Sequence, residues 1–260
     1  LKDWLNTQEL GDAESDLHLD QVLERLLADT LNVAFVAEFS RGKSELINSI
    51  FFSDYRQRVL PSSAGRTTMC PTELYFNPLD RPSLRLLPIE TKTREGSIAD
   101  LKNNPEAWTE FQLNLNSADE MSATLFHLAE TISVDGATAE SYGLINPNDE
   151  ETLRTLERDG SIAIPRWRHA LINFPHPLLK QGLVILDTPG LNAIGTEPEL
   201  TLNMLPSAHA VLFILAADTG VTKSDIEIWR QYIAPMQGAS RARLVVLNKI
   251  DGLWDDLKSP

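Results

Sequence analysis

Only one cysteine, Cys70, occurs among the 260 residues. A single thiol excludes an intrachain disulfide and is typical of a reducing compartment, so we expect a cytoplasmic protein. No apolar run approaches the roughly 18 residues of a membrane-spanning helix, and the opening LKDWLNTQEL lacks the apolar region of a signal peptide. Basic residues are few, 23 Lys and Arg against 37 Asp and Glu, a net charge of −14. That balance argues against a general nucleic-acid-binding surface.

The composition is nevertheless that of a folded protein. Hydrophobic residues make up 42% of the chain, which is enough for a packed core and argues against disorder. The length suits one large domain or two small ones. Because the chain begins without methionine and stops at DDLKSP, we expect it to be part of a longer protein.

Acidic residues are concentrated in residues 95–160. This segment contains 14 acidic and 3 basic side chains, a net charge of −11. Helical spacing dominates it, so we expect an acidic helical insertion. The apolar residues expected on one helical face are Met121, Leu125, Leu128 and Ile132. A solvated face is the simplest interpretation, and a partner surface or regulatory lid is the alternative.

Elsewhere, apolar β-rich runs alternate with helical patterns. The strand LNVAFVAEF precedes helical periodicity in KSELINSIFF, and PTELYFN and SLRLLPIET are two more candidate strands. AHAVLFILAAD and RARLVVLNKID are predicted buried strands on either side of a helix in TKSDIEIWRQYIAPM, with Thr222 or Ser224 as its N-cap. RHALINFPHPLLKQGLVILD is typical of a hairpin. The alternation predicts an α/β fold with a mostly parallel central sheet.

The stretch FVAEFSRGKSELINSIFF, residues 35–52, contains most of a phosphate-binding loop. The P-loop pattern is G-x-x-x-x-G-K-[ST]. Gly42, Lys43 and Ser44 match it, but Ala37 stands where the first glycine belongs. Alanine is acceptable there if its φ is negative, because the close backbone approach falls at Gly42. The predicted order of strand, tight loop and helix is the context that a P-loop requires.

Each part of this loop has an expected role. The backbone N–H groups from Ser40 to Ser44 lie at a helix N-terminus, where they would cradle phosphates. Lys43 would bridge the β- and γ-phosphates. The Ser44 hydroxyl would ligate Mg²⁺, which prefers hard oxygen ligands in an octahedron.

Two further motifs follow predicted strands, at the sheet edge where ligands of α/β folds bind. In VILDTPG, Asp187 is placed to hold Mg²⁺ through a water, and the Gly190 N–H can approach the γ-phosphate. In VVLNKID, Asp251 can accept hydrogen bonds from guanine N1–H and N2, which adenine lacks. Lys249 would cover the base with its stem, and Asn248 would tie this loop to the P-loop. Singly, either aspartate could be a turn residue; the ordered set favours a guanine-nucleotide site.

These motifs resemble the dynamin superfamily of large GTPases, and specifically the bacterial dynamin-like proteins. VAEFSRGKSELINSIFF is similar to their GEFSAGKSTLINAL consensus, and LPSSAGRTTMCPTELYF resembles the switch-I stretch of the mitofusin relatives. The resemblance covers most of the chain. It implies a nucleotide-contacting loop that includes Glu38 and Phe39. It also implies a switch-I threonine that closes on Mg²⁺ and the γ-phosphate, for which Thr68 is the candidate and Thr67 and Thr72 are alternatives.

Two positions depart from related GTPases. Phe39 replaces the P-loop glutamine that orients the attacking water in dynamins proper. Leu191 follows DTPG where Ras-like enzymes have glutamine. Backbone groups and Ser40 are therefore expected to position the water. Arg41 is a candidate arginine finger, in cis or across a dimer, a role that can contribute about 10³ or more to the rate; a solvent-facing arginine is the alternative.

The resemblance also implies a domain organisation. Residues 17–29, LHLDQVLERLLAD, have the spacing of an amphipathic helix. This helix resembles the first helix of the bundle beside the GTPase domain, so we assign residues 1–30 to that bundle. We assign residues 31–260 to a GTPase domain whose last guanine-contacting loop, terminal strand and terminal helix are not included.

The activity that the resemblance implies is hydrolysis of Mg²⁺-bound GTP to GDP by in-line water attack, in a homodimer formed across the nucleotide. Membrane remodelling, with peripheral attachment at the inner membrane, would then use segments outside this chain. One alternative is a slow regulatory switch that recruits a partner without membrane work. Another is a nucleotide-dependent assembly scaffold with negligible turnover.

Overall fold

The computed structural model describes residues 30–61, 70–93, 98–145, 150–189, 205–235 and 242–253. The amphipathic helix expected at 17–29 lies outside these residues. Within them, no helix has both the length and the apolar character needed to cross a membrane.

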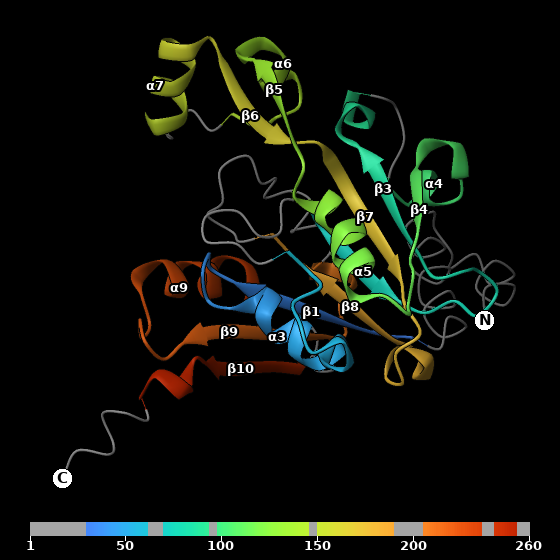
Figure 1. Ribbon diagram of the computed structural model, residues 1–260. Helices are drawn as coiled ribbons and strands as arrows, with labels where there is room; N and C mark the ends of the chain where they lie inside the picture. The colour runs from blue at the N-terminus through green and yellow to red at the C-terminus, as the bar shows by residue number, and fades with distance from the viewer. Residues whose placement is uncertain are drawn as a thin grey trace, which may run out of the picture.

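An eight-stranded sheet in the order β10-β9-β1-β8-β2-β7-β3-β4 forms the centre of the fold (Figure 1). Strands β10, β9, β1 and β8 are parallel, as are β2 and β7, whereas β8–β2, β7–β3 and β3–β4 are antiparallel pairs. The mostly parallel α/β fold expected from the sequence is confirmed. The strands are β1 (Leu31–Ala37), β2 (Thr72–Tyr75), β3 (Ser83–Pro88), β4 (Thr109–Gln112), β7 (Trp167–Asn173), β8 (Leu183–Asp187), β9 (Ala210–Ala216) and β10 (Ala242–Asn248).

The hairpin predicted for β7 and β8 is wrong, because β2 lies between them. Strand β2 pairs in parallel with β7 on one side and antiparallel with β8 on the other. The connection at 174–182 contains a short 3-10 turn, Leu179–Gln181. Strands are spaced about 4.8 Å apart, so this connection easily passes an intervening strand. The local sequence patterns predicted both strands correctly, but they did not predict which strands pair with each other.

Helices cover both faces of the sheet. In β1, Val33 and Phe35 pack into one apolar cluster with α3 (Lys43–Phe51) and α5 (Ala118–Leu125). The alternate residues Ala34 and Val36 pack into a second cluster with α9 (Lys223–Ile228) and the π-helical turn after it, Trp229–Ile233. Burial on both faces explains why the β1 sequence is a continuous apolar run.

The acidic segment is only partly helical. It contains α4 (Ile98–Lys102), α5, α6 (Gly136–Ser141) and α7 (Glu150–Asp159), but also β4 and a separate antiparallel pair, β5 (Thr131–Asp135) with β6 (Ser161–Pro165). Ile132, expected on a helical face, lies in β5, where burial alternates along TISVD with the period of a strand. Figure 1 shows β5, β6, α6 and α7 beyond one end of the main sheet.

Strand β10 was predicted to be buried, but it lies at the edge of the sheet. Its apolar side chains Leu244, Val245 and Leu247 are each more than half exposed. Among the described strands, β10 pairs only with β9. The apolar run therefore predicted the strand correctly, but not its place in the sheet or the exposure of its side chains.

Candidate functional site

The phosphate-binding loop joins β1 to α3. Ala37 is fully buried at the end of β1, and it is not among the residues with positive φ. The left-handed conformations fall at Ser40, with φ of 63°, and at Gly42, with φ of 83°. Ala37 is thus compatible with the loop, because the left-handed conformations that disfavour a side chain fall at Ser40 and Gly42 and not at Ala37.

Gly42 is needed because another loop touches it. A Cβ added at this position would lie 2.4 Å from the Asn248 Nδ2 atom, far inside contact distance. That Nδ2 group donates hydrogen bonds to the carbonyl oxygens of Arg41 at 3.0 Å and Gly42 at 3.3 Å. Asn248, at the end of β10, therefore ties the predicted guanine loop to the P-loop, as expected from the sequence.

Lys43 and Asp187 meet at the carboxyl edge of the sheet. Lys43 Nζ forms an ion pair with Asp187 Oδ1, and the two residues are only 7% and 6% exposed. Asp187 ends β8, where it is in register with Phe35 of β1 and Thr72 of β2. The Thr188 hydroxyl donates to the Phe35 carbonyl oxygen at 2.9 Å and fixes the chain just after the aspartate.

The oxygen atoms around this pair suit magnesium. Ser44 is buried in the first turn of α3, directly after Lys43, and Lys43 contacts Asp187. A hydroxyl and a carboxylate are hard ligands of the kind that Mg²⁺ binds, together with waters and phosphate oxygens. The donor set therefore fits a nucleotide-bound Mg²⁺.

The predicted base-binding residues lie at the end of β10. Lys249 has a φ of 56°, and its Cε atom lies 3.8 Å from where a Cβ on Gly42 would stand, so its stem runs beside the P-loop. Its Nζ atom contacts Asp218 Oδ2 at 3.1 Å, and this hydrogen bond is the main reason that the pKa of Asp218 is lowered. Asp251 is exposed in the turn Ile250–Leu253. Its pairing with guanine stays a prediction.

Arg41 occupies a position that neither sequence interpretation anticipated. Its side chain is 5% exposed, which contradicts a solvent-facing arginine. The guanidinium forms ion pairs with Glu38 and, at 2.9 Å, with Asp225 Oδ2, and it donates to Thr222 Oγ1 at 3.2 Å. In this conformation it is directed to the start of α9 instead of acting as an exposed finger.

Asp225 is the site residue that sequence reasoning missed. Thr222 caps α9, and Asp225 completes a capping box by accepting from the Thr222 N–H at 3.0 Å. The spacing T-x-x-D predicts the cap and the start of the helix. The second function of the carboxylate, holding Arg41, joins residues 184 positions apart and has no local signal.

Some of the remaining predicted site residues lie in the described part of the chain, and the others lie outside it. Thr72 opens β2 with its hydroxyl donating to the Cys70 carbonyl oxygen at 3.1 Å, which favours a structural role over Mg²⁺ binding. Burial raises the pKa of the Cys70 thiol to about 12, as for a packing residue. Of the other P-loop residues, Phe39 is half-buried and Ser40 is exposed. The residues that lie outside the described part of the chain are Thr67, Thr68, Gly190 and Leu191.

The chain is similar to known proteins of one family. A family model described as the dynamin family matches residues 33–250. A bacterial dynamin-like protein of Nostoc punctiforme is 29% identical over 112 residues, which are 43% of this chain and 16% of that protein. The isoniazid-induced protein IniA of Mycobacterium tuberculosis is 42% identical over 60 residues, which are 22% of this chain and 9% of IniA. The matches thus cover only a small part of these relatives.

One solved structure with a similar arrangement is a bacterial dynamin pair, described as providing a mechanism for long-range sensing and tethering of membranes. It covers 95% of this chain and 31% of its own, with a TM-score of 0.45 and 17% identity. At that score the likeness supports no functional argument.

Proposed function

The chain belongs to the dynamin family, and from that premise we propose that it is a GTPase domain that binds GTP with Mg²⁺ and hydrolyses it. The observation that carries this proposal is the convergence of three motifs at one edge of the sheet. Asn248 holds the P-loop through Arg41 and Gly42, and Lys43 contacts Asp187. Contacts between motifs that are far apart in sequence support the proposal, because nucleotide binding needs these motifs close together.

The phosphates would lie at the N-terminus of α3, where backbone N–H groups and the helix dipole attract anions. Lys43 would exchange its contact with Asp187 for the β- and γ-phosphates. Ser44 and, through a water, Asp187 would then hold the Mg²⁺ that accompanies the nucleotide and neutralises its charge. Thr68 remains our candidate for the switch-I ligand.

Specificity for guanine would come from the loop that follows β10. Asp251 would accept from N1–H and N2 of the base, and the Lys249 stem would cover its face. Asn248 would support both ends of the nucleotide, because it contacts the P-loop from the strand that carries the predicted base-binding residues.

We further propose that GTP brings two copies of the domain together across the nucleotide. Ser40, at the exposed tip of the P-loop, would help to position the attacking water in that dimer. Membrane remodelling from the cytoplasmic side, through segments outside this chain, is supported by family membership alone.

One observation favours a slow regulatory switch as the second candidate. Arg41 is the second cation of the P-loop after Lys43, and its guanidinium is held by Asp225 and Glu38. An isolated protomer would then hydrolyse GTP slowly. A partner or a second copy would have to supply the missing charge, or to release Arg41.

The test is GTP turnover per protomer over a wide range of concentrations of the full-length protein. Lys43→Ala serves as the control, because it removes the cation that we expect to contact the phosphates. Turnover that rises steeply with concentration and disappears in the control supports catalysis completed by dimerisation. A slow rate that is independent of concentration, and still abolished by Lys43→Ala, would support the isolated switch and reject the dimer mechanism. No turnover at any concentration would leave the scaffold.

A further inference from the structure

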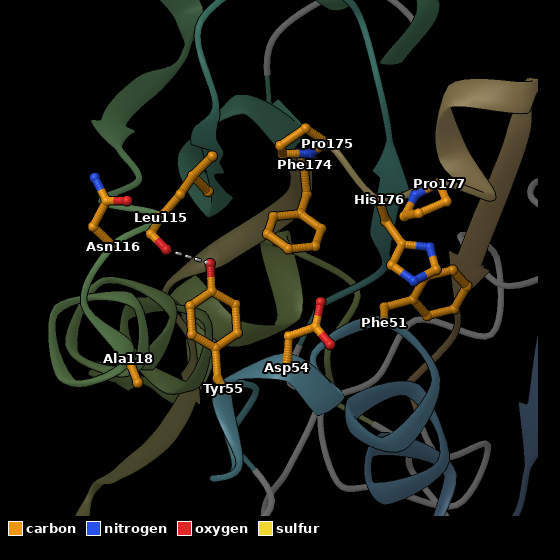
Figure 2. Close-up of a pocket in the computed structure, with 10 residues that line it drawn as sticks. All are labelled: Phe51, Asp54, Tyr55, Leu115, Asn116, Ala118, Phe174, Pro175, His176 and Pro177. Carbon is orange, nitrogen blue, oxygen red and sulfur yellow. Dashed lines mark hydrogen bonds between the residues drawn. The ribbon is translucent and has the colours of Figure 1, made fainter.

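A cavity lies at the end of α3 opposite the P-loop. Its volume is about 510 Å³, within the range of small-ligand sites. Helix α3 has nine residues, about 13 Å in length, so this cavity is separate from the nucleotide site. Figure 2 shows the lining residues Phe51, Asp54, Tyr55, Leu115, Asn116, Ala118, Phe174, Pro175, His176 and Pro177.

The walls of the cavity are mainly rings held in place by packing. Phe51 and His176 meet edge to face with their centroids 5.0 Å apart, and Tyr55 lies 6.4 Å from Phe174. The Tyr55 hydroxyl donates to the Leu115 carbonyl oxygen at 3.0 Å, which fixes the ring and leaves its face available. Little side-chain freedom would be lost when a ligand enters.

One carboxylate faces this set of rings. Figure 2 shows the Asp54 carboxylate between the Tyr55 ring on one side and the Phe51 and His176 rings on the other. Asp54 is exposed, and the structure gives it no hydrogen bond or ion pair with another described residue. The cavity therefore presents one unpaired negative charge among aromatic faces.

The other titratable groups of the cavity do not neutralise that charge. Burial lowers the pKa of His176, against an opposing effect of Asp54, so its imidazole is neutral near pH 7. Burial and the Asp54 charge raise the pKa of Tyr55, which stays protonated. On the adjoining α5, Asp119 and Glu120 add negative charge in the first turn. The surroundings thus favour a cation.

We propose that this cavity receives an arginine side chain from an extended segment of a partner protein. A guanidinium can stack on aromatic faces while it donates two parallel hydrogen bonds to a carboxylate. The prolines and the apolar walls would contact the arginine stem and its neighbours in the segment. The mouth is open and includes the exposed residues Asn116 and Pro177, which suits a side chain presented by a surface better than an enclosed small molecule.

The probe is the peptide acetyl-Gly-Arg-Gly-amide, titrated into the full 260-residue chain and followed by NMR shifts of residues lining the cavity. The same peptide with citrulline in place of arginine is isosteric and uncharged. We expect the arginine peptide to bind about tenfold more tightly than the citrulline peptide, with the largest shifts at Tyr55 and Asn116. Equal binding of the two peptides, or shifts outside the cavity alone, would overturn the proposal.

Two matched variants test the carboxylate. Asp54→Asn should reduce arginine-peptide binding to the citrulline level without changing the thermal unfolding temperature, because the Asp54 carboxylate has no partner to lose. Asp119→Asn makes the same change of charge on α5 outside the lining, and should reduce the preference for arginine far less than Asp54→Asn does. If Asp54→Asn has no effect, or both variants weaken binding equally, the site is not the one proposed. Tetramethylammonium displacing the peptide at similar concentration would indicate a small-cation site and reject an arginine partner.

Discussion

The ion pair between Arg41 and Asp225 gives the sharpest stability prediction. Asp225→Asn keeps the size of the side chain and its ability to accept one bond from the cap of α9, but removes the charge. The Asp225 carboxylate is fully buried and accepts from Arg41 Nη2 at 2.9 Å. Removing one partner of a buried pair costs about 3–5 kcal/mol. Glu38 still contacts the guanidinium, so we expect the lower end, about 3 kcal/mol, which is a large fraction of a typical stability of about 5–15 kcal/mol.

Urea unfolding followed by tryptophan fluorescence measures this loss. Glu227→Gln is the matched control, because Glu227 lies on the same helix and pairs with Lys223 at 3.6 Å on an exposed surface. That change should cost less than about 0.5 kcal/mol. Adding Arg41→Met to Asp225→Asn should restore part of the stability, because no unpaired cation then stays buried. A loss below about 1 kcal/mol for Asp225→Asn, or no recovery in the double variant, would refute the reasoning.

Two other substitutions test the site and the sheet. Gly42→Ala should abolish GTP binding in a fluorescent-nucleotide assay, because the new Cβ would collide with Asn248 and φ is 83°; binding that survives would show that the P-loop relaxes freely. Glu73→Gln tests pH dependence. Burial alone would raise the pKa of Glu73, but the hydrogen bonds and charges of His169 and Lys102 outweigh it and lower the value to about 2, from 4.5. This stabilisation, about 3 kcal/mol, is therefore complete above pH 4.5 and lost as the pH falls toward 2. The difference in unfolding free energy between the parent and the variant should shrink over that window, and a constant difference would contradict the assignment.

Local patterns in the sequence were sufficient for the elements that bind phosphate. The apolar run of β1, the glycine and lysine of the loop and the helical spacing of α3 are all encoded within residues 31–51, so their geometry followed directly. The tie made by Asn248 was also foreseeable, because the motif that contains it has a recognisable order.

Long-range pairing was beyond the reach of the same patterns. The sequence of β7 and β8 contains no signal that β2 enters between them. The apolar run of β10 likewise does not indicate which strands pair with it. The Arg41–Asp225 pair also joins distant segments, so no local pattern predicts it. Periodicity reports which face of an element is apolar, whereas strand order and ion-pair partners depend on the whole chain.

The position of β10 affects how self-association of this protein should be interpreted. Among the described strands β10 pairs with β9 alone, and its apolar side chains are exposed; a strand of this kind can pair with another strand. Two copies of this 260-residue segment could therefore join sheet to sheet along β10 whichever nucleotide is bound, whereas the terminal strand that the dynamin resemblance implies would occupy this edge in a longer protein. Association that requires GTP and association that proceeds equally well with GDP would then be two different dimers, and only the first would bring a second P-loop toward the nucleotide.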